Sequence, residues 1–129
     1  MRRMHEGKLA GATALDIWGS GNQRREFIYI DDLASATTFV LEEHDGGTIN
    51  LGGGRDMSIR ELAETIKEVV GFAGKLRFDT SKPDGMPFKA LDASALMALG
   101  WRPQVAFEDA LERTYRWFVQ REAVGVPGR

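Results

Sequence analysis

Residues 58–71, SIRELAETIKEVVG, give the clearest structural signal in the sequence. Ser58 and Glu61 have the spacing of a capping box, in which each residue's side chain bonds the backbone N–H of the other. Gly71 is the residue type that favours the left-handed conformation just past a helix C-terminus. The apolar residues between these signals form one stripe at helical spacing: Ile59, Leu62, Ile66, Val69 and Val70. We therefore predict a helix over this stretch.

The segments before this helix predict short strands and one further helix. Residues 19–22, GSGN, are turn-forming and separate two strand-like runs. Asp31 and Asp32 precede a helical pattern that continues through Leu41 and should end before Gly46. We interpret both carboxylates as helix caps and not as an acid–base pair, because a helix N-terminus favours their ionised form. The extended runs are predicted at residues 16–18, 25–30 and 48–51, and the last leads into Gly52-Gly53-Gly54.

The segments after residue 71 continue the alternation of strands and helices. Leu76 and Phe78 alternate with charged residues and predict a strand, whereas the polar, proline-containing stretch 81–87 predicts a loop. Asp92 is placed to cap a short helix that ends at Gly100. A final helix should present one apolar face, made by Phe107, Leu111, Thr114, Tyr115 and Phe118.

Length and composition limit the class of protein. The chain has 129 residues, of which 43% are hydrophobic, and no internal repeat, so we predict one α/β domain over residues 1–123 and a frayed tail at 124–129. Seventeen basic against nineteen acidic side chains argue against a nucleic-acid partner. No apolar run approaches the roughly 20 residues that span a bilayer, and residues 1–6 lack the apolar stretch of a signal peptide. We therefore expect a cytoplasmic protein without a membrane partner.

Several kinds of chemistry lack their usual sequence motif. The chain has no cysteine and only two histidines, His5 and His44, so neither a thiol nucleophile nor a metal site is predicted. The sequence from Gly19 has Arg24 where a dinucleotide-binding fingerprint has its third glycine. Residues 52–54 lack the lysine of a phosphate-binding loop, and no Gly-x-Ser-x-Gly elbow is present.

Three motifs resemble those of a known enzyme family. They are WGSG at residues 18–21, REFIYIDD at 25–32 and SKPDG at 81–85. The sequence is similar in these motifs to the extended short-chain dehydrogenase/reductases that act on nucleotide sugars. Within that superfamily it most resembles the C-terminal part of the GDP-L-fucose synthases, because FDTSKPDG at 78–85 is particular to them. These synthases are NADP-dependent 3,5-epimerases and 4-reductases of GDP-4-keto-6-deoxy-mannose.

The resemblance implies a substrate-binding part without the nucleotide-binding Rossmann half. The family's glycine fingerprint, catalytic serine and Tyr-x-x-x-Lys pair belong to that half. Tyr29 is followed four residues later by Leu33, and Tyr115 by Val119, so neither tyrosine can replace the one in that pair. The resemblance therefore implies that this chain has no catalytic residue, binds no NADP and is inactive alone. It also implies uncovered apolar surface, and hence self-association or association with the missing half.

The resemblance further implies five GDP-sugar-binding residues: Arg3, Trp18, Arg25, Asp79 and Lys82. The planar guanidinium of Arg25 could hold a diphosphate, and the Trp18 indole could stack on the ligand. Asp79 and Lys82 offer an acceptor and a cation to ribose or phosphate. From the residues alone, alternatives remain open. Arg25 could be a solvated strand-edge residue, Trp18 a core residue, Asp79 and Lys82 ordinary loop charges, and Arg3 part of a disordered end.

Two further positions bear on this site. Asp84 is interpreted as a turn-forming residue within its loop. Phe88 stands where many of the synthases have an arginine before the lysine that corresponds to Lys89, so one phosphate contact is expected to be lost. Two other functions remain open for the chain. It could be part of another nucleotide-sugar epimerase or dehydratase, or a non-catalytic binding or assembly module.

Overall fold

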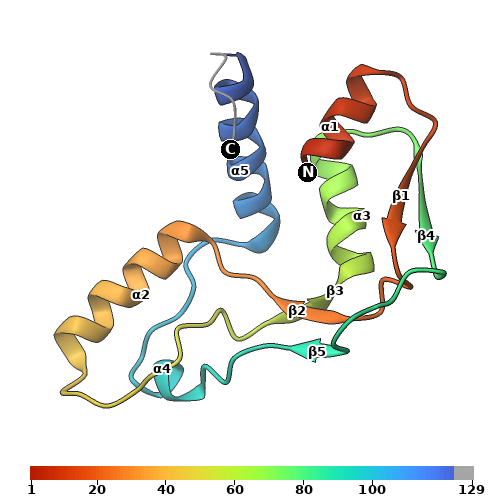
Figure 1. Ribbon diagram of the computed structural model, residues 1–129. Helices are drawn as coiled ribbons and strands as arrows, with labels where there is room; N and C mark the ends of the chain where they lie inside the picture. The colour runs from red at the N-terminus through yellow and green to blue at the C-terminus, as the bar shows by residue number, and fades with distance from the viewer. Residues whose placement is uncertain (124–129) are drawn as a thin grey trace.

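The computed structural model describes residues 1–123, and these form alternating helices and short strands (Figure 1). The helices are α1 (Arg2–Leu9), α2 (Ile30–Glu43), α3 (Ile59–Val70), α4 (Ser94–Ala98) and α5 (Phe107–Ala123). The strands are β1 (Ala14–Trp18), β2 (Arg24–Glu26), β3 (Asp56–Ser58), β4 (Lys75–Asp79) and β5 (Phe88–Lys89). The predicted frayed tail at 124–129 lies outside the described residues. The predicted α/β class is confirmed.

The strands form two small sheets. Strands β1 and β4 pair in parallel, from Ala14 opposite Lys75 to Trp18 opposite Asp79. Strand β2 lies between β3, which is antiparallel to it, and the parallel β5. Because β1 and β4 run in the same direction, the loops that follow Trp18 and Asp79 leave from one edge of the sheet.

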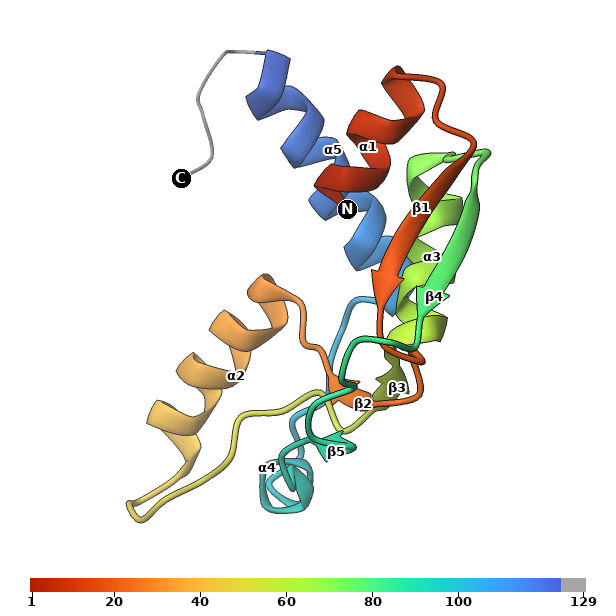
Figure 2. The ribbon, with the colours of Figure 1, turned by 45° about the vertical axis from the view of Figure 1, so that its right-hand side comes forward.

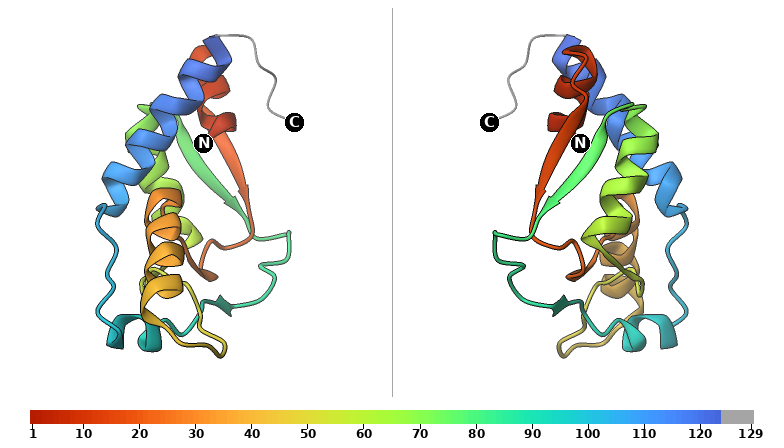
Figure 3. Two further views of the ribbon diagram at one scale, coloured as in Figure 1. Left: turned by 90° about the vertical axis from the view of Figure 1, so that its left-hand side faces the viewer. Right: turned by 90° about the vertical axis from the view of Figure 1, so that its right-hand side faces the viewer.

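One hydrophobic cluster lies between the β1–β4 pair and helices α1, α3 and α5. In the two views of Figure 3, α3 lies beside β1 and β4, and α5 lies along α3. The inward-facing Ala63 and Val70 of α3 meet Met4 of α1 and Phe72, and all four are almost fully buried. The strands add Leu15, Ile17, Leu76 and Phe78 to this cluster.

A second hydrophobic cluster lies beyond β2, among α2, α4 and the coil segments around them (Figure 2). Ala36, Leu96 and Trp101 are its buried residues. The Trp101 indole N–H donates a hydrogen bond of 3.3 Å to Ser35 Oγ, so the polar atom of this buried ring has a partner. In Figure 1, the sheet of β2, β3 and β5 lies between the group of α1, α3, β1 and β4 and the group of α2 and α4.

The helix predicted from residues 58–71 is confirmed in detail. Ser58 Oγ accepts a 3.1 Å hydrogen bond from the N–H of Glu61, and the Glu61 carboxylate accepts a 2.7 Å bond from the N–H of Ser58. Gly71 ends the helix in the left-handed conformation with φ of 68°. The strand around Leu76 and Phe78, the loop at 81–87 and the final amphipathic helix are also confirmed.

The prediction for residues 25–32 is partly wrong. The strand there stops at Glu26, and α2 begins at Ile30 with Tyr29 as its N-cap, which makes no side-chain capping bond. Asp32 is buried, and its carboxylate accepts hydrogen bonds from the N–H groups of Gln104 and Val105. Asp32 therefore holds a distant segment against α2 instead of capping the helix.

The strand predicted at residues 48–51 is absent. This stretch has no hydrogen-bonded partner strand among the described residues, and an extended segment forms a strand only when its backbone groups are paired. Ile49 and Leu51 pack instead against the second hydrophobic cluster. Helix α1 and strands β3 and β5 were not predicted. Within residues 1–123, no helix has both the length and the apolar character needed to cross a membrane.

Candidate functional site

The candidate site begins at the C-terminal ends of β1 and β4, where Trp18 lies opposite Asp79. Ligands of α/β proteins commonly bind outside the carboxyl ends of parallel strands, because loops can converge there without interrupting the sheet. The Trp18 residue is 69% exposed and belongs to neither hydrophobic cluster of the described residues. An exposed indole at this edge can offer a stacking face and an N–H donor.

The two loops that leave this edge are tied together by Asp84. Its Oδ1 accepts a 2.5 Å hydrogen bond from the N–H of Ser20, and its Oδ2 accepts a 2.7 Å bond from Ser20 Oγ. The bond from the Ser20 side chain, and next the bond from its N–H, lower the pKa of Asp84 below its usual value. The interpretation of Asp84 as a residue of a local turn is therefore wrong, because its partner lies 64 residues away.

The turn at residues 19–22 is held from its other side by Arg60 of α3. The Arg60 guanidinium donates a 2.7 Å hydrogen bond to the carbonyl oxygen of Ser20 and lies 3.6 Å from the centre of the Phe78 ring. Gly21 has φ of 80°, and a Cβ at this position would be 2.5 Å from Phe78. The turn is therefore closely packed against β4 and α3.

Asp79 and Lys82 lie where the loop leaves β4. Asp79 Oδ1 accepts hydrogen bonds from the N–H and the Oγ of Ser81, at 3.0 and 2.6 Å. These bonds, first that of the Ser81 side chain, lower the pKa of Asp79. Lys82 donates its N–H to the carbonyl oxygen of Asp79, and the residue is exposed. Asp79 therefore shapes the start of the loop and faces the same edge as Trp18.

Arg25 and Lys89 bring two positive charges together. They are Cα partners in the parallel pair of β2 and β5, so their side chains leave the same face of the sheet. Arg25 is half-buried, and its Nη1 donates a 2.6 Å hydrogen bond to the carbonyl oxygen of Arg24. Lys89 was not among the residues predicted for the site. Its sequence signal was its place just after the SKPDG motif, but only the pairing of β5 with β2 shows that it lies beside Arg25.

A hollow of about 330 Å³ adjoins these two cations, and Leu51 and Gly52 form part of its lining. Glu26 closes this region, because its two carboxylate oxygens accept hydrogen bonds from the N–H groups of Gly54 and Leu91, at 2.9 and 2.8 Å. The hollow is therefore bounded by segments that one carboxylate holds in place.

The two glycine-rich stretches do not form a cradle for the phosphates of a dinucleotide such as NADP. The N–H of Gly54 is already bonded to Glu26, and the N–H of Ser20 is bonded to Asp84. A Cβ at Gly52 would lie 2.5 Å from the Glu26 carboxylate, so the Glu26 side chain occupies the space beside this glycine. Neither glycine-rich stretch is therefore free to hold the phosphates of such a cofactor.

Arg3 lies apart from the β2–β5 pair, in helix α1. Its Nη2 donates a 2.8 Å hydrogen bond to the carbonyl oxygen of Asp16 in β1. Asp16 also forms a salt bridge with Arg77 of β4, at 2.7 Å. Arg3 is thus placed on the β1 backbone, two residues before Trp18.

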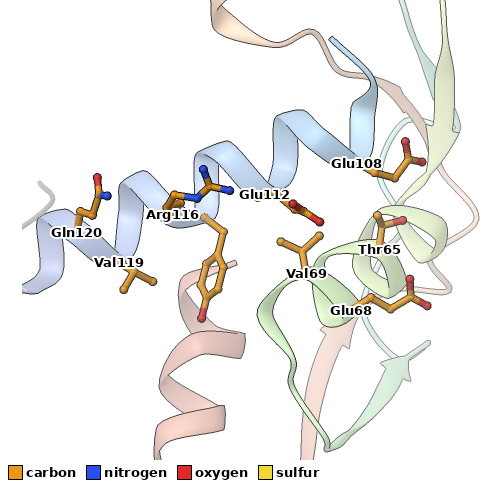
Figure 4. Close-up of a pocket in the computed structure, with 9 residues that line it drawn as sticks. Thr65, Glu68, Val69, Glu108, Glu112, Arg116, Val119 and Gln120 are labelled. Atoms are coloured by element: carbon orange, nitrogen blue, oxygen red, sulfur yellow. The ribbon is translucent and has the colours of Figure 1, made fainter.

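A larger groove, of about 610 Å³, lies between α3 and α5 (Figure 4). Val69 of α3 and Val119 of α5 contribute apolar lining, and Glu68, Glu112 and Arg116 contribute charged side chains. None of the five predicted site residues lines this groove.

Among residues 1–123, no three histidine, aspartate or glutamate side chains are grouped so that they could hold a metal ion.

Comparisons with known proteins show which family this chain resembles. The model of the NAD dependent epimerase/dehydratase family matches residues 1–52. Further matches cover nearly the whole chain, which is similar to the C-terminal part of an extended short-chain dehydrogenase/reductase.

Its relatives include the GDP-L-fucose synthases. GDP-L-fucose synthase 1 of Arabidopsis thaliana is 50% identical over 121 residues, which are 93% of this chain and 38% of that protein. GDP-L-fucose synthase of Escherichia coli is 42% identical, over 95% of this chain and 41% of that protein. The chain thus spans about two fifths of the length of these curated relatives.

Solved structures agree with this relationship. A GDP-L-fucose synthetase from Naegleria fowleri superposes on 95% of this chain with a TM-score of 0.86 and 28% identity, and covers it with 38% of its own length. The same protein has been solved bound to NADP. UDP-glucose 4-epimerase from Thermotoga maritima superposes with a TM-score of 0.77 and 26% identity, over 93% of this chain and 39% of that one.

Proposed function

We propose that this chain is the GDP-sugar-binding part of a GDP-L-fucose synthase-like enzyme, an NADP-dependent 3,5-epimerase and 4-reductase of GDP-4-keto-6-deoxy-mannose. The observation that carries the proposal is the pairing of Arg25 with Lys89 beside a hollow of about 330 Å³. The similarity to the GDP-L-fucose synthases, over more than nine tenths of the chain, supports the choice of ligand.

The two cations suit a diphosphate. Like charges directly opposite each other in a sheet destabilise it, and a bound anion relieves that repulsion. The planar fork of Arg25 can bind two phosphate oxygens at once, and Lys89 adds a mobile point charge. The chain as a whole has a net charge of -2, so the pair is a local positive feature and not part of a generally basic surface.

The remaining site residues suit the other parts of a nucleotide sugar. Trp18 presents an exposed ring on which a base or sugar can stack, and Asp79 and Lys82 follow at the same edge. Asp79 keeps one carboxylate oxygen, Oδ2, beyond the two bonds that Ser81 makes to Oδ1. That oxygen can accept a hydrogen bond from a ribose or sugar hydroxyl. Arg3 is proposed as a further contact from α1.

We propose that the proton-transfer and redox chemistry of the whole enzyme belongs to its nucleotide-binding Rossmann half and not to this chain. Tyr115 donates to or accepts from His5 Nδ1 at 2.9 Å, and neither it nor Tyr29 is followed at four residues by a lysine. When bound by that other part, NADP would supply the hydride for reduction. This chain's residues bind and orient the sugar nucleotide, and we propose that the chain is inactive alone.

Titration calorimetry with GDP-mannose tests the binding proposal. We expect weak, salt-sensitive binding by the unchanged chain. Arg25→Ala should bind about tenfold to a hundredfold more weakly, because a charge-assisted hydrogen bond contributes about 1.5–3 kcal/mol. Lys89→Ala and Trp18→Ala should weaken binding as well. Lys75→Ala is the matched control, because Lys75 begins β4 at the end opposite Asp79. Absence of binding at millimolar ligand, or equal binding by Arg25→Ala, contradicts the proposal.

A second candidate function keeps the site and changes the nucleotide. The superposition with a UDP-glucose 4-epimerase favours it, since that protein shares the fold of this region. Thermal stabilisation by GDP-, UDP- and dTDP-sugars, compared at equal concentration, distinguishes the two. Preferential stabilisation by a UDP- or dTDP-sugar would replace the GDP-sugar assignment. Stabilisation by none of the three would favour the non-catalytic binding or assembly module.

A further inference from the structure

We propose that Asp84 is a positioning residue, which fixes the loop at residues 80–87 against the turn at residues 19–22 by its two hydrogen bonds to Ser20. The inference rests on the proposed function, because this loop contains Lys82 and leads directly into Lys89. Asp84 would then set the positions of Lys82 and Lys89 without contacting the ligand itself.

The loop has few other means of keeping its position. All of its residues, 80–87, are exposed, so no buried side chain holds it to either hydrophobic cluster. At its start, the N–H of Lys82 bonds the carbonyl oxygen of Asp79, and at its end the carbonyl oxygen of Pro87 accepts a 2.8 Å bond from the N–H of Arg24. Between these two ends, the bonds that Asp84 accepts from Ser20 tie the loop to the rest of the described chain.

The turn on the other side is built to receive this carboxylate. Gly19 has φ of 83°, and a Cβ there would lie 2.3 Å from Asp84 Oδ1, so any other residue would displace Asp84. Ser20 is held through three atoms, since its N–H and Oγ bond Asp84 while its carbonyl oxygen bonds Arg60. Because Arg60 belongs to α3, the loop is connected through Ser20 to a helix that is capped at both ends and packed into the first hydrophobic cluster.

Loss of this connection should weaken ligand binding by a predictable route. A loop that is already ordered loses little conformational entropy when a ligand contacts it, whereas a mobile loop must be ordered at the cost of affinity. We expect Asp84→Ala to bind GDP-mannose about tenfold more weakly than the unchanged chain. Asp84→Asn should lie between them, because its amide has a single acceptor oxygen.

Hydrogen exchange of the Ser20 amide, measured by NMR without ligand, reports the connection independently of binding. Asp84→Ala should accelerate this exchange at least about tenfold while the amides of α3 stay unchanged. Ser20→Ala should weaken binding, and Ser20→Thr should restore it because threonine keeps the hydroxyl. Asp45→Ala is the matched control, because Asp45 is also an exposed aspartate that precedes a glycine.

The outcomes separate this inference from the proposed function. Faster Ser20 exchange together with weaker binding in Asp84→Ala, and neither change in Asp45→Ala, supports the positioning role. Equal binding by Asp84→Ala and the unchanged chain overturns the positioning role alone. Unchanged Ser20 exchange in Asp84→Ala overturns it as well. Absence of binding by the unchanged chain overturns the proposed function, and with it this role for Asp84.

Discussion

The carboxylate of Asp32 in α2 accepts hydrogen bonds from two successive backbone N–H groups, those of Gln104 at 3.0 Å and Val105 at 3.3 Å. Asp32 is only 4% exposed, and these bonds satisfy its buried oxygens. The contact joins the first turn of α2 to the segment that leads into α5. It therefore links the second hydrophobic cluster to the helix that packs on α3.

This contact predicts a large effect of Asp32→Ala on stability. The substitution leaves two backbone N–H groups without their acceptor, so the free energy of unfolding should fall by about 1–3 kcal/mol. The neighbouring Asp31→Ala is the control, since Asp31 is exposed and should change stability by only about 0.5 kcal/mol. Urea denaturation measures both. Equal effects of the two substitutions would contradict the role given to Asp32.

The capping box at α3 predicts a second effect on stability. Ser58→Ala removes the acceptor for the N–H of Glu61 and should lower the free energy of unfolding by about 0.5–2 kcal/mol. Glu64→Ala, an exposed site one turn further along the same helix, should be close to neutral. Thermal and urea unfolding measure the free energy of unfolding of both variants. If the cap were unimportant, Ser58→Ala would be as close to neutral as Glu64→Ala.

Acid should destabilise the chain through its hydrogen-bonded carboxylates. Ser81 holds the pKa of Asp79 below the ordinary value of 3.8, Ser20 does so for Asp84, and Ser94 for Asp92. A carboxyl whose pKa is lower in the folded chain contributes stability above its unfolded value and loses it as the pH falls through the folded value. Stability should therefore be lost below about pH 4. Melting temperatures between pH 6 and 3 test this, and Asp84→Asn should show a shallower decline.

Helix α2 has an uncovered apolar face that predicts self-association. Ile30 and Leu41 lie eleven residues apart, which is close to three helical turns, and are 66% and 81% exposed. Burying such area contributes about 25 cal/mol per Å², so we expect the purified chain to form dimers or larger species. Leu41→Lys should shift sedimentation toward the monomer. Leu9→Lys, at an equally exposed leucine of α1, should not. A monomer at high concentration would contradict this prediction.

Those parts of the fold that depend on local signals could be predicted from the sequence. The Ser58–Glu61 capping box, the glycine at position 71 and the apolar spacing between them act within a few residues, and α3 has the expected bounds. The turn at 19–22 and the loop at 81–87 follow likewise from their glycine and proline residues. The prediction of an exposed ligand-binding role for Trp18, in contrast, came from the family resemblance.

Only the tertiary structure decided the contacts between distant segments. Residues 48–51 have the composition of a strand but lack a partner among the described residues, so pairing and not propensity determined their state. Asp32 and Asp84 each resembled a local capping or turn residue, yet each bonds a segment more than sixty residues away. Lys89 lies beside Arg25 because β5 pairs with β2. The sequence by itself therefore determined helices α2 to α5 and the turns, but not α1. The arrangement of the site depended on long-range hydrogen bonds, whose partners no local pattern specifies.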